Sequence, residues 1–332
     1  MSIWNELPQP FFILAPMEAV TDVVFRHVVT KAAAPDLYFT EFTNATGWVH
    51  AGDKAIGGRL IKTNDEAPII AQLWGAVPDD MAKLAAHCKT LGYDGVDINM
   101  GCPDSSAVKA GGGAGMILTP ENASDMIAAA KTSGLPISVK TRLGYSRVDE
   151  WREWLTHILK QDVVNLTIHL RTKKEMSKVE AHFELIPEII ALRDEIAPNT
   201  LLTINGDIMS KAHGLELIER YPGINGVMIG RGIFKDPFCF ANTTDWHVQY
   251  AAYKEGTQIE YRHPRPKEDL IELLKYHLDL YDQYSGVTGR PFDTLKRFFK
   301  IYIHSFDGAA ELRDKLMHSK TTDEVRSLLT TH

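Results

Sequence analysis

Short apolar runs rich in β-branched residues recur about every thirty residues, from the amino terminus to about residue 230. Each run is followed by small or polar residues and then by an amphipathic stretch with helical spacing. We predict a strand from each of these runs: Phe12 to Met17, Tyr38 to Phe42, Ile69 to Trp74, Val96 to Met100, Ile137 to Thr141, Asn165 to His169, Leu201 to Asn205 and Val227 to Gly230. Eight strands that alternate with helices predict an α/β fold, a TIM (β/α)8 barrel.

The pattern changes after about residue 246, where strand-like runs stop and helical periodicity continues. We predict helices over Lys267 to Gln283, Thr294 to Ser305 and Ala309 to His318. The stretch His263-Pro264-Arg265-Pro266 has the composition of a linker or turn. We therefore expect two domains, the barrel over residues 1–245 and a small helical domain over residues 246–332.

Composition and charge are those of an ordinary globular enzyme. Of the 332 residues, 44% are hydrophobic and 24% charged, values typical of soluble folded proteins. The formal net charge of −7 argues against a protein coated with positive charge, so any contact with nucleic acid must be local. Three widely spaced cysteines argue against a disulfide framework. Because neither a secretory leader nor a membrane span is predicted, we expect a cytoplasmic protein.

Polar side chains gather where the predicted strands end, which is where barrel enzymes place their active sites. These residues are Glu41, Gln72, Asn99, Cys102, Lys140, Arg142, His169, Arg171, Asn205, Asp207 and Arg231. A purely structural barrel has no need for a thiol, an ammonium and an imidazole at one mouth. The chain is therefore expected to have an active site there.

The last two strand ends have the composition of a phosphate site. They carry Asn205-Gly206-Asp207 and Gly230-Arg231-Gly232. In many barrels such loops bind a phosphate through backbone N–H groups, and Arg231 would add positive charge. The alternative is that the glycines only form tight turns. Both loops together favour phosphate binding.

Lys140 and Gln72 are candidates to contact a cofactor ring. The ammonium of Lys140 would point into the mouth and stabilise negative charge on a reduced flavin, or else form an ion pair with Asp97 or Asp207. Gln72 would contact the pyrimidine edge of the flavin or satisfy a loop backbone group.

Cys102 lies between Gly101 and Pro103 on the loop after the fourth predicted strand. A thiol with an ordinary pKa near 8.5 is protonated at neutral pH, so it can act as a general acid. The alternative is a small buried apolar residue, which is how we interpret Cys88 and Cys239.

Two other functional readings have little support. The glycine-rich stretch from Gly111 to Gly115 lacks the Lys-Ser or Lys-Thr of a nucleotide-phosphate loop, and we predict a flexible loop beside Cys102. No metal site is expected, because the sequence has neither an H-x-x-x-H pair nor a Cys-x-x-Cys pair.

These motifs together resemble the tRNA-dihydrouridine synthases over nearly the whole chain. The resemblance rests on Ala15 to Asp22, Asn99-Met100-Gly101-Cys102-Pro103, Val139 to Gly144, His169-x-Arg171-Thr172, Asn205-Gly206-Asp207 and Gly230-Arg231-Gly232, in this order on successive strands. The helical tail, with Lys296 to Lys300 and Gly308 to Arg313, is similar to the RNA-binding domain of the family. One departure is Asp104-Ser105-Ser106 after Pro103, where many members have a basic residue.

The resemblance implies a cofactor, a substrate and a reaction. FMN, reduced by NADPH or NADH, would transfer a hydride to C6 of a uracil in tRNA, and Cys102 would protonate C5. The implied cofactor contacts are Pro16, Met17, Glu18, Gln72, Lys140, His169, Asn205, Gly206, Asp207, Gly230 and Arg231. The implied substrate contacts are Asn99, Arg142, Lys296, Arg297 and Lys300. We expect tRNA as the partner and no obligate protein partner.

The tail residues and the function each have an alternative interpretation. The basic residues of the tail alternate with Phe298, Phe299 and Tyr302, which are expected to be core residues of an amphipathic helix. The rival functions are a small-molecule FMN-dependent pyrimidine reductase and a non-catalytic RNA-binding protein built on a barrel.

Overall fold

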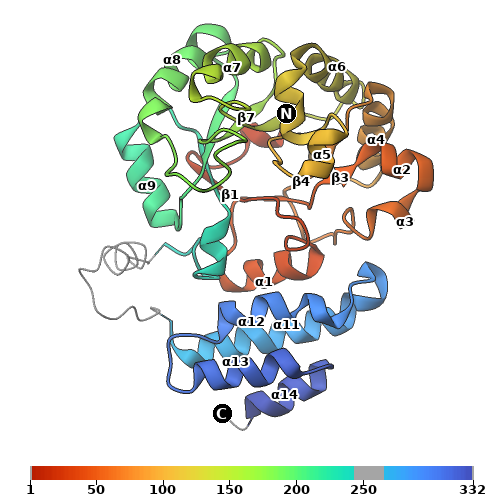
Figure 1. Cartoon of the computed structure of the whole chain (residues 1–332), viewed down its shortest axis with the longest axis vertical. Helices are drawn as coiled ribbons and strands as arrows, with labels where there is room; N and C mark the ends of the chain where they lie inside the picture. The colour runs from red at the N-terminus through yellow and green to blue at the C-terminus, as the bar shows by residue number, and fades with distance from the viewer. Residues whose placement is uncertain (1, 243–264, 331–332) are drawn as a thin grey trace.

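The predicted barrel is confirmed by the computed structural model, which describes residues 2–242 and 265–330 (Figure 1). All strand pairs are parallel, and pairing of β2 with β4 closes the sheet. The strands are β1 (Phe11–Leu14), β2 (Leu37–Phe39), β3 (Thr43–Asn44), β4 (Ile69–Trp74), β5 (Gly95–Met100), β6 (Ile137–Arg142), β7 (Asn165–His169), β8 (Leu201–Asn205) and β9 (Gly226–Ile229).

The second predicted strand differs from the prediction, because it is interrupted between β2 and β3. The side chain of Thr40 replaces a backbone group of the ladder, since its hydroxyl accepts a hydrogen bond from the amide of Gln72 at 3.0 Å. The next residue, Glu41, is turned away from the ladder and contacts other loops. Together β2 and β3 occupy one of the eight barrel positions.

Helices cover the outside of the barrel and form the carboxy-terminal region. The barrel helices are α1 (Val23–Ala33), α2 (Ala45–Ala51), α3 (Asp53–Ile56), α4 (Pro78–Thr90), α5 (Ser105–Lys109), α6 (Pro120–Lys131), α7 (Trp151–Leu159), α8 (Ile186–Ile196) and α9 (Lys211–Arg220). The short 3-10 helices are η1 (Ile3–Asn5), η2 (Gly113–Leu118), η3 (Val148–Glu150), η4 (Phe183–Leu185), η5 (Arg231–Phe234) and η6 (Phe292–Thr294). The carboxy-terminal helices are α11 (Lys267–Thr288), α12 (Lys296–Tyr302), α13 (Ala309–His318) and α14 (Thr322–Thr330).

Side chains alternate between the two faces of the closed sheet, as the period of a strand requires. Along β1, Phe11 and Ile13 lie in the smaller core cluster inside the barrel, whereas Phe12 and Leu14 belong to the main cluster with the helices. Trp4 from η1 fills the amino-terminal end of the barrel. Its ring packs edge-on against that of Phe11, with the two ring centroids 5.9 Å apart. Apolar side chains therefore fill this end of the interior beside β1, β2, β4 and β9, whereas buried polar side chains such as Asp97 and Asn165 lie inside the barrel on β5 and β7.

The helical region packs against the outside of the barrel below α1 (Figure 1). The rings of Phe25 on α1 and Phe298 on α12 have centroids 4.7 Å apart. Gly58 approaches α11 closely, because a Cβ atom there would lie 3.2 Å from the Cα of Thr288. The two parts thus share a continuous apolar core.

The helical region differs from the prediction in its details. Helix α11 extends to Thr288, and α14 was not predicted. Phe298, Phe299 and Tyr302 are buried, as expected for an amphipathic helix. The predicted boundary at residues 245 and 246, together with His263 and Pro264, lies outside the described residues.

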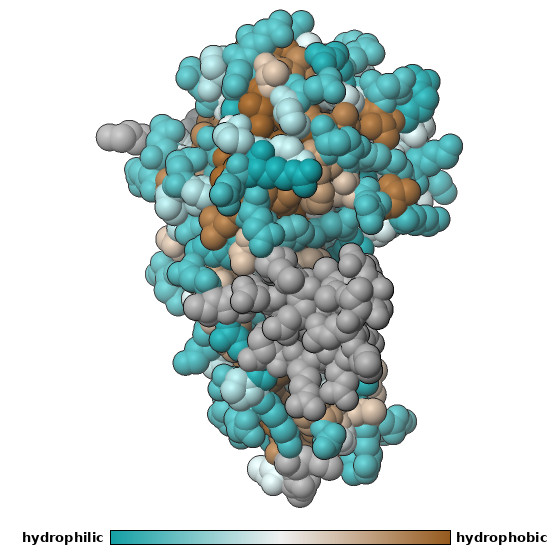
Figure 2. All heavy atoms as spheres, turned by 90° about the vertical axis from the view of Figure 1, so that its left-hand side faces the viewer, coloured by the Kyte–Doolittle hydropathy of each residue, from teal (hydrophilic) through white to brown (hydrophobic). Residues whose placement is uncertain are grey.

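The molecular surface in Figure 2 is mainly hydrophilic over both parts, with apolar residues visible between the polar ones. Within the described ranges, the helices are all too short or too polar to span a membrane.

A buried ion pair supports the amino-terminal part of the barrel. The guanidinium of Arg26 contacts the Glu66 carboxylate at 2.5 and 3.1 Å, and both side chains are at least 95% buried. Arg26 also donates to the carbonyl oxygens of Thr21 and Ile61, each at 2.8 Å. Arg26 thereby links α1 to the loop before β4.

Replacement of Glu66 by Ala is predicted to lower the free energy of unfolding by about 3–5 kcal/mol, because it leaves the charge of Arg26 buried without a counterion. Urea denaturation measures this change. Glu188→Ala is the matched control, since its partner Arg152 is more than half exposed and the pair contributes less than about 1 kcal/mol. Equal losses in the two variants would contradict the prediction.

Candidate active site

Parallel register brings the predicted polar residues together at the carboxyl ends of the strands. Arg142 on β6 is paired with His169 on β7, which is paired with Asn205 on β8. On the other side, Asn99 on β5 is paired with Lys140 on β6. Because paired residues point to the same face of a sheet, these five side chains line one end of the barrel.

A first cavity of about 260 Å³ opens at this end. It brings together most of the predicted cofactor residues: Pro16, Met17, Lys140, His169, Asn205, Gly206, Asp207, Gly230 and Arg231. Arg142 and Pro103 also line it. The predicted cofactor residues Glu18 and Gln72 do not line this cavity.

A second cavity of about 540 Å³ lies beside the first. It is lined by Glu18, Phe42, Asn44, Ala55, Ile56, Arg59, Trp74, Cys102, Asp104, Ser106 and Ala107. The two cavities share two walls, because Met17 and Pro103 line the first while their chain neighbours Glu18 and Cys102 line the second. The thiol therefore lies at the boundary between a cavity rich in cations and a cavity with aromatic residues.

The first cavity is strongly cationic. Burial, together with the charge of nearby Arg142, lowers the pKa of Lys140 to about 8, and burial lowers that of Arg142 to about 10. Burial and the same cations hold the pKa of His169 well below its ordinary value, so its imidazole is neutral at pH 7. An anionic group placed here would relieve this repulsion.

Lys140 and Arg142 have different partners. The ammonium of Lys140 donates to Asn205 Oδ1 at 3.2 Å, in place of an ion pair with Asp97 or Asp207. Arg142 donates to three backbone oxygens, on Gly101 at 2.7 Å, Thr172 at 3.1 Å and Met176 at 3.0 Å. Arg142, predicted to bind substrate, thus holds two loops of the mouth, whereas Lys140 keeps donor capacity toward the cavity.

The candidate phosphate end is organised around Asp207. Its carboxylate forms ion pairs with Arg171 and, at 2.6 Å, with Arg231. Gly206 has a φ of 120°, a conformation that requires glycine. A Cβ atom on Gly230 would lie 3.4 Å from the Ala15 side chain, so this glycine leaves the wall of the cavity open. Two loops with small residues and a nearby guanidinium fit an anionic group.

Asn99 and a glycine-rich segment hold the loop of Cys102. Asn99 Oδ1 accepts hydrogen bonds from the amides of Gly101 at 3.0 Å and Cys102 at 2.9 Å. The carbonyl oxygen of Cys102 accepts from Ala114 at 2.9 Å, and a Cβ atom on Gly113 would approach this oxygen to 2.7 Å. Gly113 to Gly115 are buried in η2, in contrast to the predicted flexible loop, because the missing side chains allow close packing against Cys102.

The Cys102 thiol is protonated at neutral pH. Burial raises its pKa above the ordinary value, although a hydrogen bond with the backbone of Asp104 and the charges of Arg142 and Lys140 oppose this shift. Cys88 and Cys239 are fully buried, as predicted for core residues. The side chain of Cys102 is partly exposed, so it is the cysteine that a molecule in the second cavity can reach.

A chain of hydrogen bonds beneath the cavities fixes the orientation of two amides. Gln72 Nε2 donates to Asp97 Oδ2 at 2.7 Å, and Gln72 Oε1 accepts from Asn99 Nδ2 at 3.0 Å. Burial raises the pKa of Asp97 to about 6, while hydrogen bonds from Ser138 and Gln72 oppose the shift. Gln72 thus lies one layer below the cavities and supports Asn99.

The basic residues of the tail lie along a groove between α12 and α13. Lys296, Arg297 and Lys300 line it together with Arg313. Arg297 also donates to the carbonyl oxygen of Ala19 in the barrel at 2.9 Å, and Lys296 pairs with Asp293 at 2.7 Å. Lys300 is exposed.

Sequence reasoning missed several residues of this end of the barrel. Arg171 was quoted within a motif but given no role, and it is almost fully buried against Asp207. Phe42, Arg59 and Trp74 line the second cavity from three separate segments. Phe42 and Trp74 each end a predicted strand, whereas the position of Arg59 carries no local signal.

The chain is similar in sequence to a known family over almost its whole length. A family model described as "Dihydrouridine synthase (Dus)" matches residues 13–332. The "Probable tRNA-dihydrouridine synthase 2" of Bacillus subtilis is 54% identical over 329 residues, which cover 99% of this chain and 95% of that protein. The "Probable tRNA-dihydrouridine synthase" of Staphylococcus epidermidis is 50% identical over 331 residues, with coverage of 99% and 96%.

The "Structure of morphinone reductase in complex with tetrahydroNAD" aligns with 78% of this chain and 90% of that chain, at 12% identity and a TM-score of 0.48. The family is shown by the match over almost the whole length and by relatives that share half of their residues. The chain therefore belongs to the dihydrouridine synthase family, whose members are oxidoreductases.

Proposed function

We propose that this protein reduces the C5–C6 bond of a uridine in tRNA, with FMN as its cofactor and NADPH or NADH as the electron donor. The observation that carries the proposal is the position of the Cys102 thiol. It is protonated and lies where a cation-rich cavity meets a second cavity. A proton donor and a site for an anionic cofactor are therefore adjacent.

The residues of the first cavity fit FMN. Gly206 and Gly230, with Arg231, would surround the phosphate, because they offer close backbone approach and positive charge. Lys140 would stabilise negative charge on the ring, because burial and Arg142 lower its pKa and an adjacent anion would favour its charged form. Pro16, Met17, His169 and Asn205 would contact the ring, and Gln72 would act from the layer below. Glu18 would lie on the side of the second cavity.

The second cavity fits a base taken out of the tRNA stack. When bound, FMN supplies the hydride that adds to C6 of the uracil. Cys102 gives its proton to C5, and burial keeps this thiol protonated until the base is in place. Phe42 and Trp74 offer rings beside the thiol against which a flipped base can pack.

The helical region, proposed to begin near residue 246, supplies the surface for the tRNA backbone. Its groove carries Lys296, Lys300 and Arg313 on a chain that is acidic as a whole. Arg297 reaches the barrel as well, so it serves the junction between the two parts. Asn99 supports Cys102, and through this contact it would act on the uracil site.

Replacement of Cys102 by Ala is expected to lower dihydrouridine formation by about 100-fold or more, because it removes the general acid. Bound flavin, its reduction by NADPH and tRNA affinity should remain, since the first cavity and the groove are unchanged. The measurement is dihydrouridine content in unmodified tRNA after a timed reaction, with flavin followed by visible absorption. Parental rates in this variant would show that another group donates the proton.

Alkylation of the native protein is expected to occur at Cys102 and to be slow at neutral pH. Only the thiolate reacts, and burial raises the pKa of this thiol, so the rate should still be increasing above pH 9.0. Mass spectrometry after iodoacetamide treatment gives the site and the rate. Cys102→Ser is the control, because Cys88 and Cys239 are fully buried. A rate that reaches its plateau below pH 9.0 would contradict the raised pKa.

Replacement of Lys296 and Lys300 by Gln is predicted to weaken tRNA binding and to lower its salt dependence, by about 1 in the logarithmic slope for each lost phosphate contact. These positions are preferable to Arg297, whose bond to Ala19 would confound the result. Lys315→Gln is the control, since Lys315 lies in a different groove and pairs with Glu311. An unchanged slope would place the RNA surface on the barrel loops.

A further inference from the structure

Ala19 has an unusual backbone conformation at a central position. Its φ is 58°, in the left-handed region that residues with a Cβ atom rarely adopt. It directly follows Met17 and Glu18, which line the first and the second cavity respectively. Its conformation therefore influences the positions of Met17 and Glu18, which form the wall between the two cavities.

Both backbone polar groups of Ala19 are held by side chains. The amide donates to the carboxylate of Glu41, and the carbonyl oxygen accepts from Arg297 of α12 at 2.9 Å. Glu41 lies at the interruption between β2 and β3 and is fully buried. One anchor comes from the barrel and the other from the helical region.

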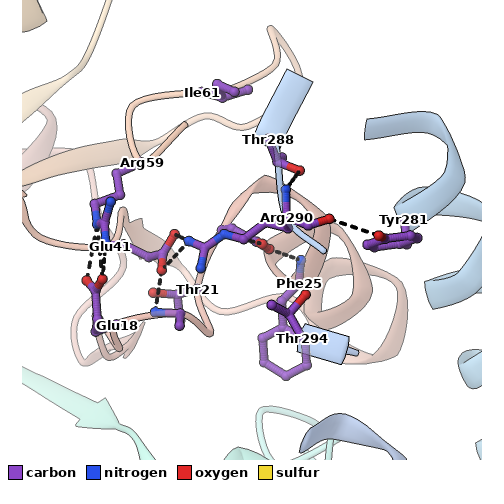
Figure 3. Close-up of polar contacts among 12 residues, drawn as sticks. Glu18, Thr21, Phe25, Glu41, Arg59, Ile61, Tyr281, Thr288, Arg290 and Thr294 are labelled. Carbon is purple, nitrogen blue, oxygen red and sulfur yellow. Dashed lines mark hydrogen bonds and ion pairs between the residues drawn. The ribbon is translucent and has the colours of Figure 1, made fainter. Parts of the chain in front are cut away.

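The buried charge of Glu41 is balanced by Arg290, which follows α11. Arg290 Nη2 contacts the two carboxylate oxygens at 2.8 and 2.5 Å, as Figure 3 shows. Burial raises the pKa of Glu41, and Arg290 opposes this effect. The ionised form that accepts from Ala19 thus depends on a guanidinium from the helical region.

Arg290 is itself held in place. Its carbonyl oxygen accepts from the Tyr281 hydroxyl at 2.8 Å (Figure 3). Its Nε lies 3.9 Å from the carboxylate of Asp22, the N-cap of α1. Only 15% of its side chain is exposed, so it is not available as a general phosphate contact.

We propose that Arg290 is a positioning residue for the reaction: through Glu41, and together with Arg297, it holds Ala19 and thereby the Met17–Glu18 wall between the cofactor and uracil sites. The inference rests on the proposed placement of FMN and uracil in the two cavities. Attachment of the helical region and the geometry of the active site then form one coupled system.

A consequence concerns the barrel in isolation. Without the helical region, Glu41 loses its counterion Arg290. The carbonyl oxygen of Ala19 loses its hydrogen bond from Arg297, and the amide of Ala19 keeps only a carboxylate that is no longer balanced by Arg290. The strained φ of Ala19 is then no longer imposed by its surroundings. The helical region therefore contributes to the cofactor site as well as to tRNA binding.

The test uses the full-length protein with Arg290→Gln and Arg290→Lys. We expect Arg290→Gln to lower kcat for dihydrouridine formation by about tenfold or more and to raise the Kd for FMN, because the wall shared by the two sites moves. The KM for tRNA should change by less than about threefold, because the basic groove is intact. Arg290→Lys keeps the charge but loses the paired contacts, so it should lie between Arg290→Gln and the parent.

Two further variants separate positioning from general stability. Arg326→Gln removes a guanidinium that pairs with Asp279, Asp282 and Asp323 inside the helical region, and it should leave kcat and FMN affinity at parental values. Combining Glu41→Gln with Arg290→Gln should cost no more in kcat than the larger single effect, because both residues act through one contact.

The outcomes are distinct. Parental kcat and FMN affinity in Arg290→Gln would overturn the inference, as would additive losses in the double variant. A rise in KM for tRNA at unchanged kcat would also overturn it and assign Arg290 to RNA binding. A parent protein that forms dihydrouridine without any flavin would instead overturn the proposed function.

Discussion

The register of parallel pairing across β5 to β8 is the constraint on which the site depends. Because side chains alternate along a strand, a shift by one residue would turn Asn99, Lys140, His169 and Asn205 outward into the helices and bring aliphatic neighbours inside. Hydrogen bonds inside the barrel link these strands: Ser138 on β6 donates to Asp97 on β5, and Thr203 on β8 donates to Asn165 on β7, each at 2.7 Å. A slip by one residue would separate these buried polar groups. Polar contacts within the barrel therefore maintain the chemistry at its mouth.

Electrostatics give the two cavities different properties. The first contains Lys140 and Arg142, whose charged forms are disfavoured by burial, so a bound anion would stabilise them. The carboxylate of Asp207 is already neutralised by Arg171 and Arg231 and does not cancel this field. Near the second cavity, burial favours the uncharged form of Cys102. Removal from water thus lowers the pKa of Lys140, a base, and raises the pKa of Cys102, an acid, at the same end of the barrel.

The sequence predicted the features that local patterns determine. Strand periodicity and polar strand ends located eight barrel positions and most of the first cavity, because both signals lie within a few consecutive residues. The interruption at Thr40 and Glu41 was not predictable, since the contacts made there join residues far apart in the sequence, such as Glu41 and Arg290, 249 positions away. The second cavity was missed for a similar reason: Phe42, Arg59 and Trp74 meet only after the barrel closes. The segment from Gly113 to Gly115 was predicted wrongly because composition does not distinguish close packing from mobility.

The ion pair between Glu41 and Arg290 limits how the two parts of such a protein can evolve. In a chimera with a helical region from a relative, the residue of that relative at position 290 would contact Glu41 of the recipient barrel. If that residue carried no positive charge, the Glu41 carboxylate would be buried without a counterion. Exchange of helical regions between homologues therefore requires correlated change on both sides of the junction, and a designed chimera has to transfer the pair as a unit.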